Sequence, residues 1–256
     1  MDKLSRRNLF KVAGGAGAAA AVPHGFTVRK AEAQTGVEAP VVAPSESSAA
    51  PAHAGHDDVL FFFTTEEARF VEAAVDRLIP ADEEWPGAVW AGVVNFLDRQ
   101  LAGAYGAGAR MYLEGPWELG VSQQGYQLPY TPAELFRIGI QEVRDWLAEH
   151  EGETEFWDLS VSRQIEILQM LEAGAIPLPS MPSSVLFETL LATTVEGWFA
   201  DPAYGGNREM VSWRMIGFPG AYAQYVDLVT EYGRPYERPP MSMAEVARSH
   251  DHHGKH

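Results

Sequence analysis

The sequence contains no cysteine in its 256 residues. This absence excludes disulfide bonds, thioether attachment of haem and cysteine-ligated iron–sulfur clusters. Histidine is also scarce in the middle of the chain, because only His150 lies between His56 and His250. A Ser-His-Asp triad or a histidine-rich metal centre would therefore have one candidate imidazole, at the expected end of a helix.

Long apolar runs and nucleotide-binding loops are missing as well. The apolar run at residues 12–22 has about eleven residues, whereas a membrane-spanning helix needs about 20. Residues 15–20 fit the pattern G-x-G-x-x-A, but no strand precedes them, so we reject a dinucleotide-binding interpretation. Gly103, Gly106 and Gly108 follow a helical pattern and lack the lysine of a P-loop.

The start of the chain carries a pair of arginines, in Ser5-Arg6-Arg7-Asn8-Leu9-Phe10-Lys11, ahead of the Ala/Gly-rich run. This arrangement is typical of a twin-arginine signal, which exports proteins that have already folded. Arg6, Arg7 and Phe10 are its candidate residues, and Ala31-Glu32-Ala33 is a small-x-small cleavage site. A Sec signal or an N-terminal membrane anchor is the alternative. We expect a periplasmic protein, with the twin-arginine translocase as a transient partner.

The chain is strongly acidic, with 35 Asp and Glu against 19 Lys and Arg. Removing residues 1–33 takes away six basic and two acidic side chains and leaves 13 and 33, a formal charge of −20. Such a surface repels phosphate backbones and anionic lipid, so nucleic acid and direct membrane binding are disfavoured. The simplest interpretation is a solvated acidic surface, and a basic partner is not required.

The composition divides the chain into four parts. A signal is predicted at residues 1–33, and an Ala/Pro/Ser-rich segment with few large apolar side chains at 34–60. That segment cannot bury enough surface to offset its ordering entropy, so we expect it to be flexible. A helical domain is predicted at 61–235, and a His-rich tail at 236–256. The tail histidines could bind a divalent metal, but a disordered tail is the favoured interpretation.

The domain is predicted to be all-α, because no window shows the sustained alternation of a strand. Capping boxes at Thr64–Glu67 and Thr131–Glu134 mark two helix starts, and Pro132 suits the first helical position. A long loop is expected at 103–127. The predicted helices cover residues 65–78, 88–102, 109–113, 132–150, 161–171, 184–199 and 222–232.

Two acidic groups are candidates for general acid–base chemistry. One is Asp82-Glu83-Glu84, after Pro80, and the other comprises Asp145, Glu149 and Glu151. Acid–base catalysis needs two carboxylates held across a cleft with separated pKa values. Neighbouring acids in a loop are more typical of a solvated turn, which is the favoured interpretation here.

The richest segment runs from Gly197 to Gly220, where Asp-Pro and Gly-Gly-Asn turns are surrounded by aromatic residues and arginines. Trp, Tyr and Arg are enriched at the energetic centres of protein interfaces. Packing of these aromatics on the domain's own core is the alternative, and both can hold for different side chains. The candidate interface residues are Trp198, Phe199, Asp201, Tyr204, Asn207, Arg208, Trp213 and Arg214.

Over roughly residues 61–230 the chain resembles the gluconate 2-dehydrogenase subunit 3 family. The resemblance rests above all on the long block Ala200-Asp201-Pro202 to Gly220. More modest blocks occur in the expected order: residues 76–82, 87–101, 115–117, 125–127 and 131–134.

The resemblance implies a helical, non-catalytic partner of an exported flavoprotein. In this family the large subunit, a glucose-methanol-choline-type oxidoreductase, holds FAD and oxidises a sugar, sugar acid or polyol. A multihaem cytochrome c subunit often carries the electrons onward. The small subunit is thought to support maturation and export of the large one. We therefore expect no catalytic, cofactor-binding or metal-binding residue in this chain. An independent binding or structural module, or an enzyme that uses the acidic loops, remains the alternative.

Overall fold

The computed structural model describes residues 59–118, 127–221, 228, 230–231, 233 and 238–246. The predicted signal with Arg6, Arg7 and Phe10 lies outside these residues. So do nearly all of segment 34–60, most of the helix predicted at 222–232 and the histidines of the tail. The described residues confirm the all-α prediction, and their only β-type pairing is one isolated bridge between Gly220 and Met241.

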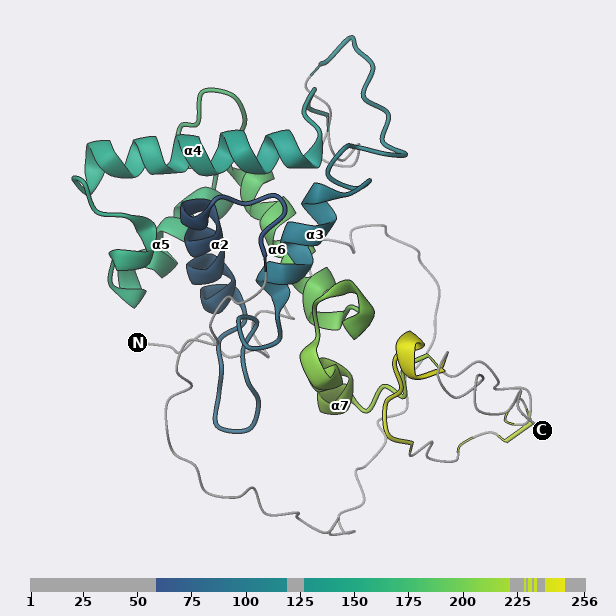
Figure 1. Cartoon of the computed structure of the whole chain (residues 1–256). Helices are drawn as coiled ribbons and strands as arrows, with labels where there is room; N and C mark the ends of the chain where they lie inside the picture. Colours follow the sequence, from purple (N-terminus) through teal and green to yellow (C-terminus); the bar gives the residue numbers. More distant parts are fainter. Residues whose placement is uncertain are drawn as a thin grey trace, which may run out of the picture. The chain divides into compact units, whose positions relative to one another are not determined.

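The helices follow one another along the chain as shown in Figure 1. They are α2 (Thr65–Leu78), α3 (Val93–Ala102), α4 (Pro132–His150), η2 (Phe156–Asp158), α5 (Val161–Glu172), α6 (Ser183–Phe199), η3 (Pro202–Tyr204), η4 (Arg208–Met210) and α7 (Val211–Ile216).

The helix starts that the caps predict are confirmed. At α2 the Glu67 amide donates to the Thr64 hydroxyl and the Thr64 amide donates to the Glu67 carboxylate (2.8 Å). Thr131 and Glu134 form the same reciprocal pair at α4. Ser160 caps α5 through the amide of residue 163. Local side-chain chemistry thus places three of the helices without help from tertiary contacts.

Helix α6 is the central element, because it packs against α2, α3, α4, α5 and α7. Helix α4 lies across α2 and α6 (Figure 1). Helix α6 buries eight of its 17 residues, and its exposed residues Glu188, Ala192 and Glu196 are four apart, so one stripe of the helix faces solvent. Two of its buried hydroxyls are satisfied within the helix: Thr193 and Thr194 donate to the carbonyls of Thr189 and Leu190 (2.8 and 2.6 Å).

The prediction of a helix at 88–102 is wrong at its start, because α3 begins at Val93. Gly92 has φ +78°, in the left-handed region, so a regular helix cannot pass through it. Residues 88–92 form turns instead, and Val89, expected to be buried, is half-buried.

The short helix predicted at 109–113 is also wrong. Residues 104–110 form turns and residues 111–113 have no regular structure. The reason is again backbone conformation, since Gly108 and Arg110 have φ +71° and +70°. The predicted long loop begins at Gly103 as expected, and its part at 119–126 lies outside the described residues.

Candidate functional site

The turns after α6 dock backbone to backbone against α6 itself and against the start of α3. A Cβ atom added to Gly206 would lie 2.1 Å from the carbonyl oxygen of Gly197. A Cβ atom added to Gly92 would lie 2.7 Å from the carbonyl oxygen of Gly205. Only glycine permits approaches this close. Two segments far apart in the sequence, 87–101 and 197–220, therefore form one structural unit, which we call the glycine junction.

Asn207 holds the junction together from inside. Its side chain is fully buried, and its Nδ2 donates to the Ala200 carbonyl (2.9 Å). Its Oδ1 accepts from the amide and the hydroxyl of Ser212 (2.9 and 2.8 Å). The next amide, of Arg208, donates to the Ala91 carbonyl at the start of α3 (2.9 Å). One amide side chain thus ties the end of α6 to α7 while the backbone beside it binds α3.

The junction also stores backbone strain. Asn207, Glu209 and Met210 have φ values of 45°, 54° and 56°. The left-handed conformation costs roughly 1–2 kcal/mol for a residue with a side chain. Such strain persists only where the surroundings impose it, and it clusters at functional sites. Three strained positions within four residues therefore make this turn, rather than a cleft, the candidate functional site.

The structure separates the eight candidate interface residues by exposure. Trp198 is 0% exposed, Asn207 is fully buried, and Trp213 is 6% exposed. The Trp213 indole donates to the carbonyl of Phe199 (2.9 Å). These three side chains belong to the domain's own core, which was the alternative interpretation of the sequence. Phe199 and Asp201 are half-buried.

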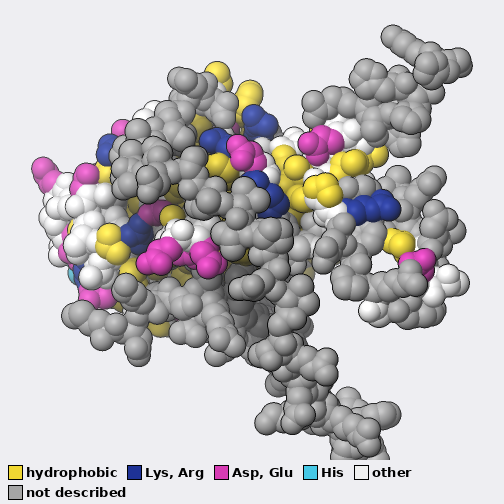
Figure 2. Space-filling view, turned by 90° about the horizontal axis from the view of Figure 1, so that it is seen from below, with side chains coloured by type: hydrophobic (Ala, Val, Ile, Leu, Met, Phe, Trp, Pro, Cys, Tyr) yellow, Lys and Arg dark blue, Asp and Glu magenta, His cyan; other side chains and the backbone are white. Residues whose placement is uncertain are grey.

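The remaining three candidates, Tyr204, Arg208 and Arg214, are exposed. Figure 2 views the molecule from the α7 side and shows hydrophobic side chains gathered beside Lys and Arg side chains. Sequence reasoning missed three exposed apolar members of this neighbourhood: Ile216, Phe218 and Met243. The first two lie in the block already singled out. Nothing in the sequence pointed to Met243, because it is connected to this block by a tertiary contact. Its amide donates a hydrogen bond to Asp201 (2.8 Å), which lies 42 residues earlier in the chain.

A second feature that the sequence did not reveal lies at the start of the domain. The carboxylate of Asp98 is 2% exposed and accepts the backbone amides of Phe61, Phe62 and Phe63 (2.7, 3.0 and 2.9 Å). Arg137 covers the same segment, with its guanidinium 4.5 Å from the centre of the Phe62 ring. We call this arrangement the Asp98 clamp. The sequence feature that could have indicated the clamp is Asp98 itself, a charged residue within the apolar pattern of α3.

Three of the six acidic residues considered for catalysis, Asp82, Asp145 and Glu151, have structural partners. Asp82 Oδ1 accepts the amides of Glu84 and Trp85 (3.0 and 2.8 Å), as in a tight turn. Glu151 forms an ion pair with Arg163 (2.5 Å), which raises the pKa of that arginine. Asp145 accepts a hydrogen bond from Gln141 (2.8 Å).

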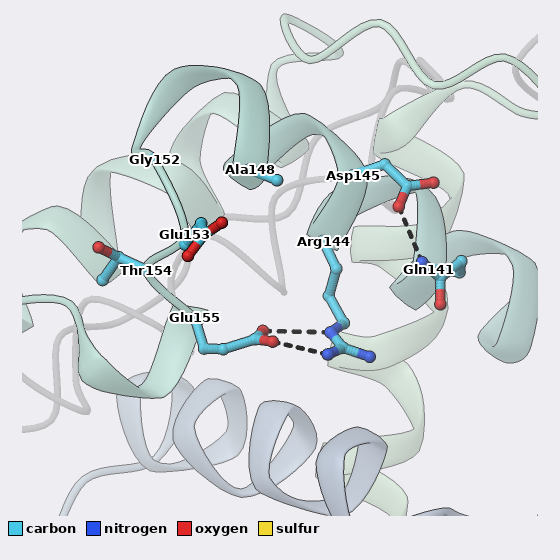
Figure 3. Close-up of a pocket in the computed structure, with 8 residues that line it drawn as sticks. All are labelled: Gln141, Arg144, Asp145, Ala148, Gly152, Glu153, Thr154 and Glu155. Atoms are coloured by element: carbon cyan, nitrogen blue, oxygen red, sulfur yellow. Dashed lines mark hydrogen bonds and ion pairs between the residues drawn. The ribbon is translucent and has the colours of Figure 1, made fainter.

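A shallow polar cleft of about 280 Å³ lies between the second half of α4 and the segment before η2 (Figure 3). Arg144 is the only cation among its lining residues, and its Nε and one terminal nitrogen donate to the two carboxylate oxygens of Glu155 (3.1 and 2.6 Å). This bidentate pairing raises the pKa of Arg144. Because Glu155 already neutralises the charge of Arg144, the cleft would attract an anionic ligand only weakly. Its lining residues are Gln141, Arg144, Asp145, Ala148, Gly152, Glu153, Thr154 and Glu155.

Glu196, near the end of α6, is the described carboxylate whose pKa is raised, and desolvation by the surrounding protein is the cause. Burial and the charge of Glu196 also raise the pKa of the Tyr105 hydroxyl. A raised carboxyl pKa means that the folded state holds the proton more tightly than the unfolded state. The ionised carboxylate therefore weakens the fold as pH rises from the ordinary value of 4.5 through the folded pKa.

Replacing Glu196 with Gln is expected to stabilise the fold at pH 7, by less than about 1 kcal/mol because solvent screens this side chain. The gain should fade below pH 4.5, where the wild-type carboxyl is protonated in both states. Thermal melts of wild type and variant between pH 4 and pH 7 measure the difference. A gain that is the same at every pH would contradict the assignment.

The described residues contain no group of three or more His, Asp or Glu side chains placed to hold a metal ion. Within the same residues, no helix has both the length and the apolar composition needed to cross a bilayer.

The protein is thus a helical domain, and its backbone is most constrained at a surface turn where glycines allow two segments to approach closely. The family model described as gluconate 2-dehydrogenase subunit 3 matches residues 65–220, and the chain belongs to this family. The matched range runs from α2 to α7 and contains the whole glycine junction. Because the family is a subunit of a multi-subunit dehydrogenase, a partner subunit is implied. No curated protein and no solved structure matches the chain.

Proposed function

We propose that this chain is the non-catalytic small subunit of an exported FAD-dependent dehydrogenase of the glucose-methanol-choline type. The large subunit holds FAD and oxidises a sugar, a sugar acid or a polyol, and a multihaem cytochrome c carries the electrons onward. The small subunit supports assembly, stability and twin-arginine export of the large one into the periplasm. The observation that carries the proposal is the family match over residues 65–220.

The N-terminal sequence supports the export part of the proposal. Arg6 and Arg7 precede a weakly apolar run, as in signals of the pathway that transports folded proteins. If the small subunit carries the export signal for both subunits, the two have to form a complex before transport. At micromolar subunit concentrations this requires a dissociation constant well below 1 μM, or a binding free energy stronger than about −8 kcal/mol. The small subunit therefore needs a sizeable, pre-formed binding surface.

The export role is tested by co-expressing the chain with the FAD-containing subunit encoded beside it. With Arg6 and Arg7 both replaced by Lys, the flavoprotein is expected to accumulate in the cytoplasm, because the translocase no longer recognises the pair. Cell fractionation followed by a flavin and activity assay of each fraction measures the result.

The matched control replaces Arg29 with Lys, which changes an arginine of the same predicted signal outside the pair. This variant should export the flavoprotein normally. Normal periplasmic flavoprotein with the double lysine variant would refute the carrier role. Complex formation in the cytoplasm, measured in the same cells by co-purification, tests the subunit role separately.

A further inference from the structure

We infer that the partner subunit docks on the exposed side of the 201–220 block, and that it presents apolar side chains and carboxylates there. We call this surface the turn face. It comprises Tyr204, Arg208, Arg214, Ile216, Phe218 and Met243, with Arg99 at its edge. The inference rests on the proposed function, because it names the surface that the small subunit uses.

The turn face carries four of the nine exposed large apolar side chains of the described residues; the others are Val59, Phe61, Tyr112, Trp117 and Val161. Tyr204, Ile216, Phe218 and Met243 are 50%, 57%, 44% and 43% exposed. Single exposed apolar residues are common on any protein, but several within one short block indicate an interaction site. Val161, on α5, has a similar exposure (54%) and lies outside this block.

The turn face is held in place before any partner arrives. The Phe218 ring packs edge-on against Trp213, with 5.2 Å between ring centres. Met243 is fixed by the hydrogen bond from its amide to Asp201, and Met241 pairs with Gly220. The strained turn and the buried Asn207 fix the position of Arg208. A surface ordered in advance loses less entropy on binding, so its contacts convert more fully into affinity.

The charges indicate what the partner presents. Five arginines of the described residues, Arg77, Arg137, Arg144, Arg163 and Arg214, pair with carboxylates of the chain itself. No ion pair within the described residues involves Arg99 or Arg208, although acidic residues outnumber basic ones; Arg69 and Arg110 are unpaired as well.

Arg99 lies against the turn that leads to Arg208. The Arg99 guanidinium approaches the position that a Cβ atom on Gly205 would occupy (3.4 Å), and Arg208 follows three residues later. Arg208 also lies over the ring of Trp90, at 5.9 Å from its centre. Two cations near one turn, in no ion pair within the described residues and close in the chain to exposed apolar side chains, fit carboxylates from another protein. An anionic membrane is the less suitable occupant, because the formal charge of the whole chain is −16.

The test measures binding of the full chain to the flavin-loaded large subunit by surface plasmon resonance. Ile216→Glu and Arg208→Glu are each expected to raise the dissociation constant about 30-fold or more, the effect of an interface hot spot. The matched controls are Val161→Glu, with the same exposure, and Arg69→Glu. Arg69 is exposed and lies over the ring of Trp157 (4.5 Å), as Arg208 does over Trp90. Both controls should bind within about twofold of wild type.

Salt gives a second readout. The association rate of wild type should fall as salt rises, because the arginines attract carboxylates from a distance. Arg208→Glu should lose much of this dependence, whereas Arg69→Glu should keep it. Thermal melts confirm that each variant is folded, which is expected because the substituted side chains are exposed.

The outcomes separate the two proposals. If wild type binds the flavoprotein and all four variants weaken binding equally, the turn face is refuted while the proposed function stands. If wild type does not bind at all, both are refuted. If the turn-face variants change only self-association, measured by light scattering, or only binding to phosphatidylglycerol vesicles, the occupant is a second copy or a membrane and the inference is wrong.

Discussion

Replacing Trp198 with Ala is expected to lower the free energy of unfolding by about 4 kcal/mol, as for other fully buried tryptophans. Trp198 has no exposed surface and lies in the last turn of α6, the helix that packs against five others. Truncation would open a cavity where the rigid glycine junction cannot collapse to fill it. An interface residue of the same type would instead leave the stability of the free subunit almost unchanged.

Urea denaturation monitored by circular dichroism measures this loss, and Phe199→Ala is the matched control. Phe199 is the next residue in the chain and is only half-buried, so its truncation should cost less, about 1–2 kcal/mol. Under conditions where Trp198→Ala stays folded, its affinity for the large subunit should be close to that of wild type. A stable Trp198→Ala variant that no longer bound the partner would show that this tryptophan reaches the interface.

The parts of the fold that sequence reasoning predicted best are those decided by local chemistry. Capping boxes at Thr64 and Thr131 and the cap at Ser160 place the starts of α2, α4 and α5 at the expected residues. A cap side chain bonds an amide three residues away, so the sequence contains the whole interaction. The apolar periodicity that follows each cap then indicates which side faces the core.

The failures share one physical feature, which is left-handed backbone inside the predicted helices. Gly92 is left-handed and in close contact with Gly205, more than a hundred residues later. The residues around Gly92 in the sequence do not indicate that contact, and glycine is tolerated inside many helical patterns. Gly108 and Arg110 interrupt the helix predicted at 109–113 in the same way.

The candidate site shows a similar division. Residue types alone indicated that the 197–220 block was important, because Trp, Tyr, Arg and Gly-Gly-Asn are concentrated there. They could not tell Trp213, which points into the core, from its neighbour Arg214, which is exposed. Helix α7 has only six residues, too few for a periodic pattern to assign its faces. Met243 and Arg99 join the turn face through tertiary contacts alone.

Replacing Asp98 with Ala is expected to lower the free energy of unfolding by about 3 kcal/mol. The carboxylate is buried and accepts three backbone amides, and hydrogen bonds to a charged acceptor contribute about 1.5–3 kcal/mol each. The total is reduced because the amides of Phe61 and Phe62 are only partly buried, so water can replace their acceptor. The Phe63 amide is buried and would be left without one.

The loss should be concentrated at the start of the domain, because the Asp98 clamp joins α3 to the segment before α2. Hydrogen exchange at the amides of Phe61 to Phe63 should accelerate more than exchange in α6, and chymotrypsin should cut there before the domain unfolds.

Asp98→Asn is the matched control. It keeps the Oδ1 acceptor of Phe62 and Phe63 but turns an NH2 group towards Phe61, so about half of the loss is expected. Equal acceleration of exchange throughout the domain would show that Asp98 supports the core rather than this segment.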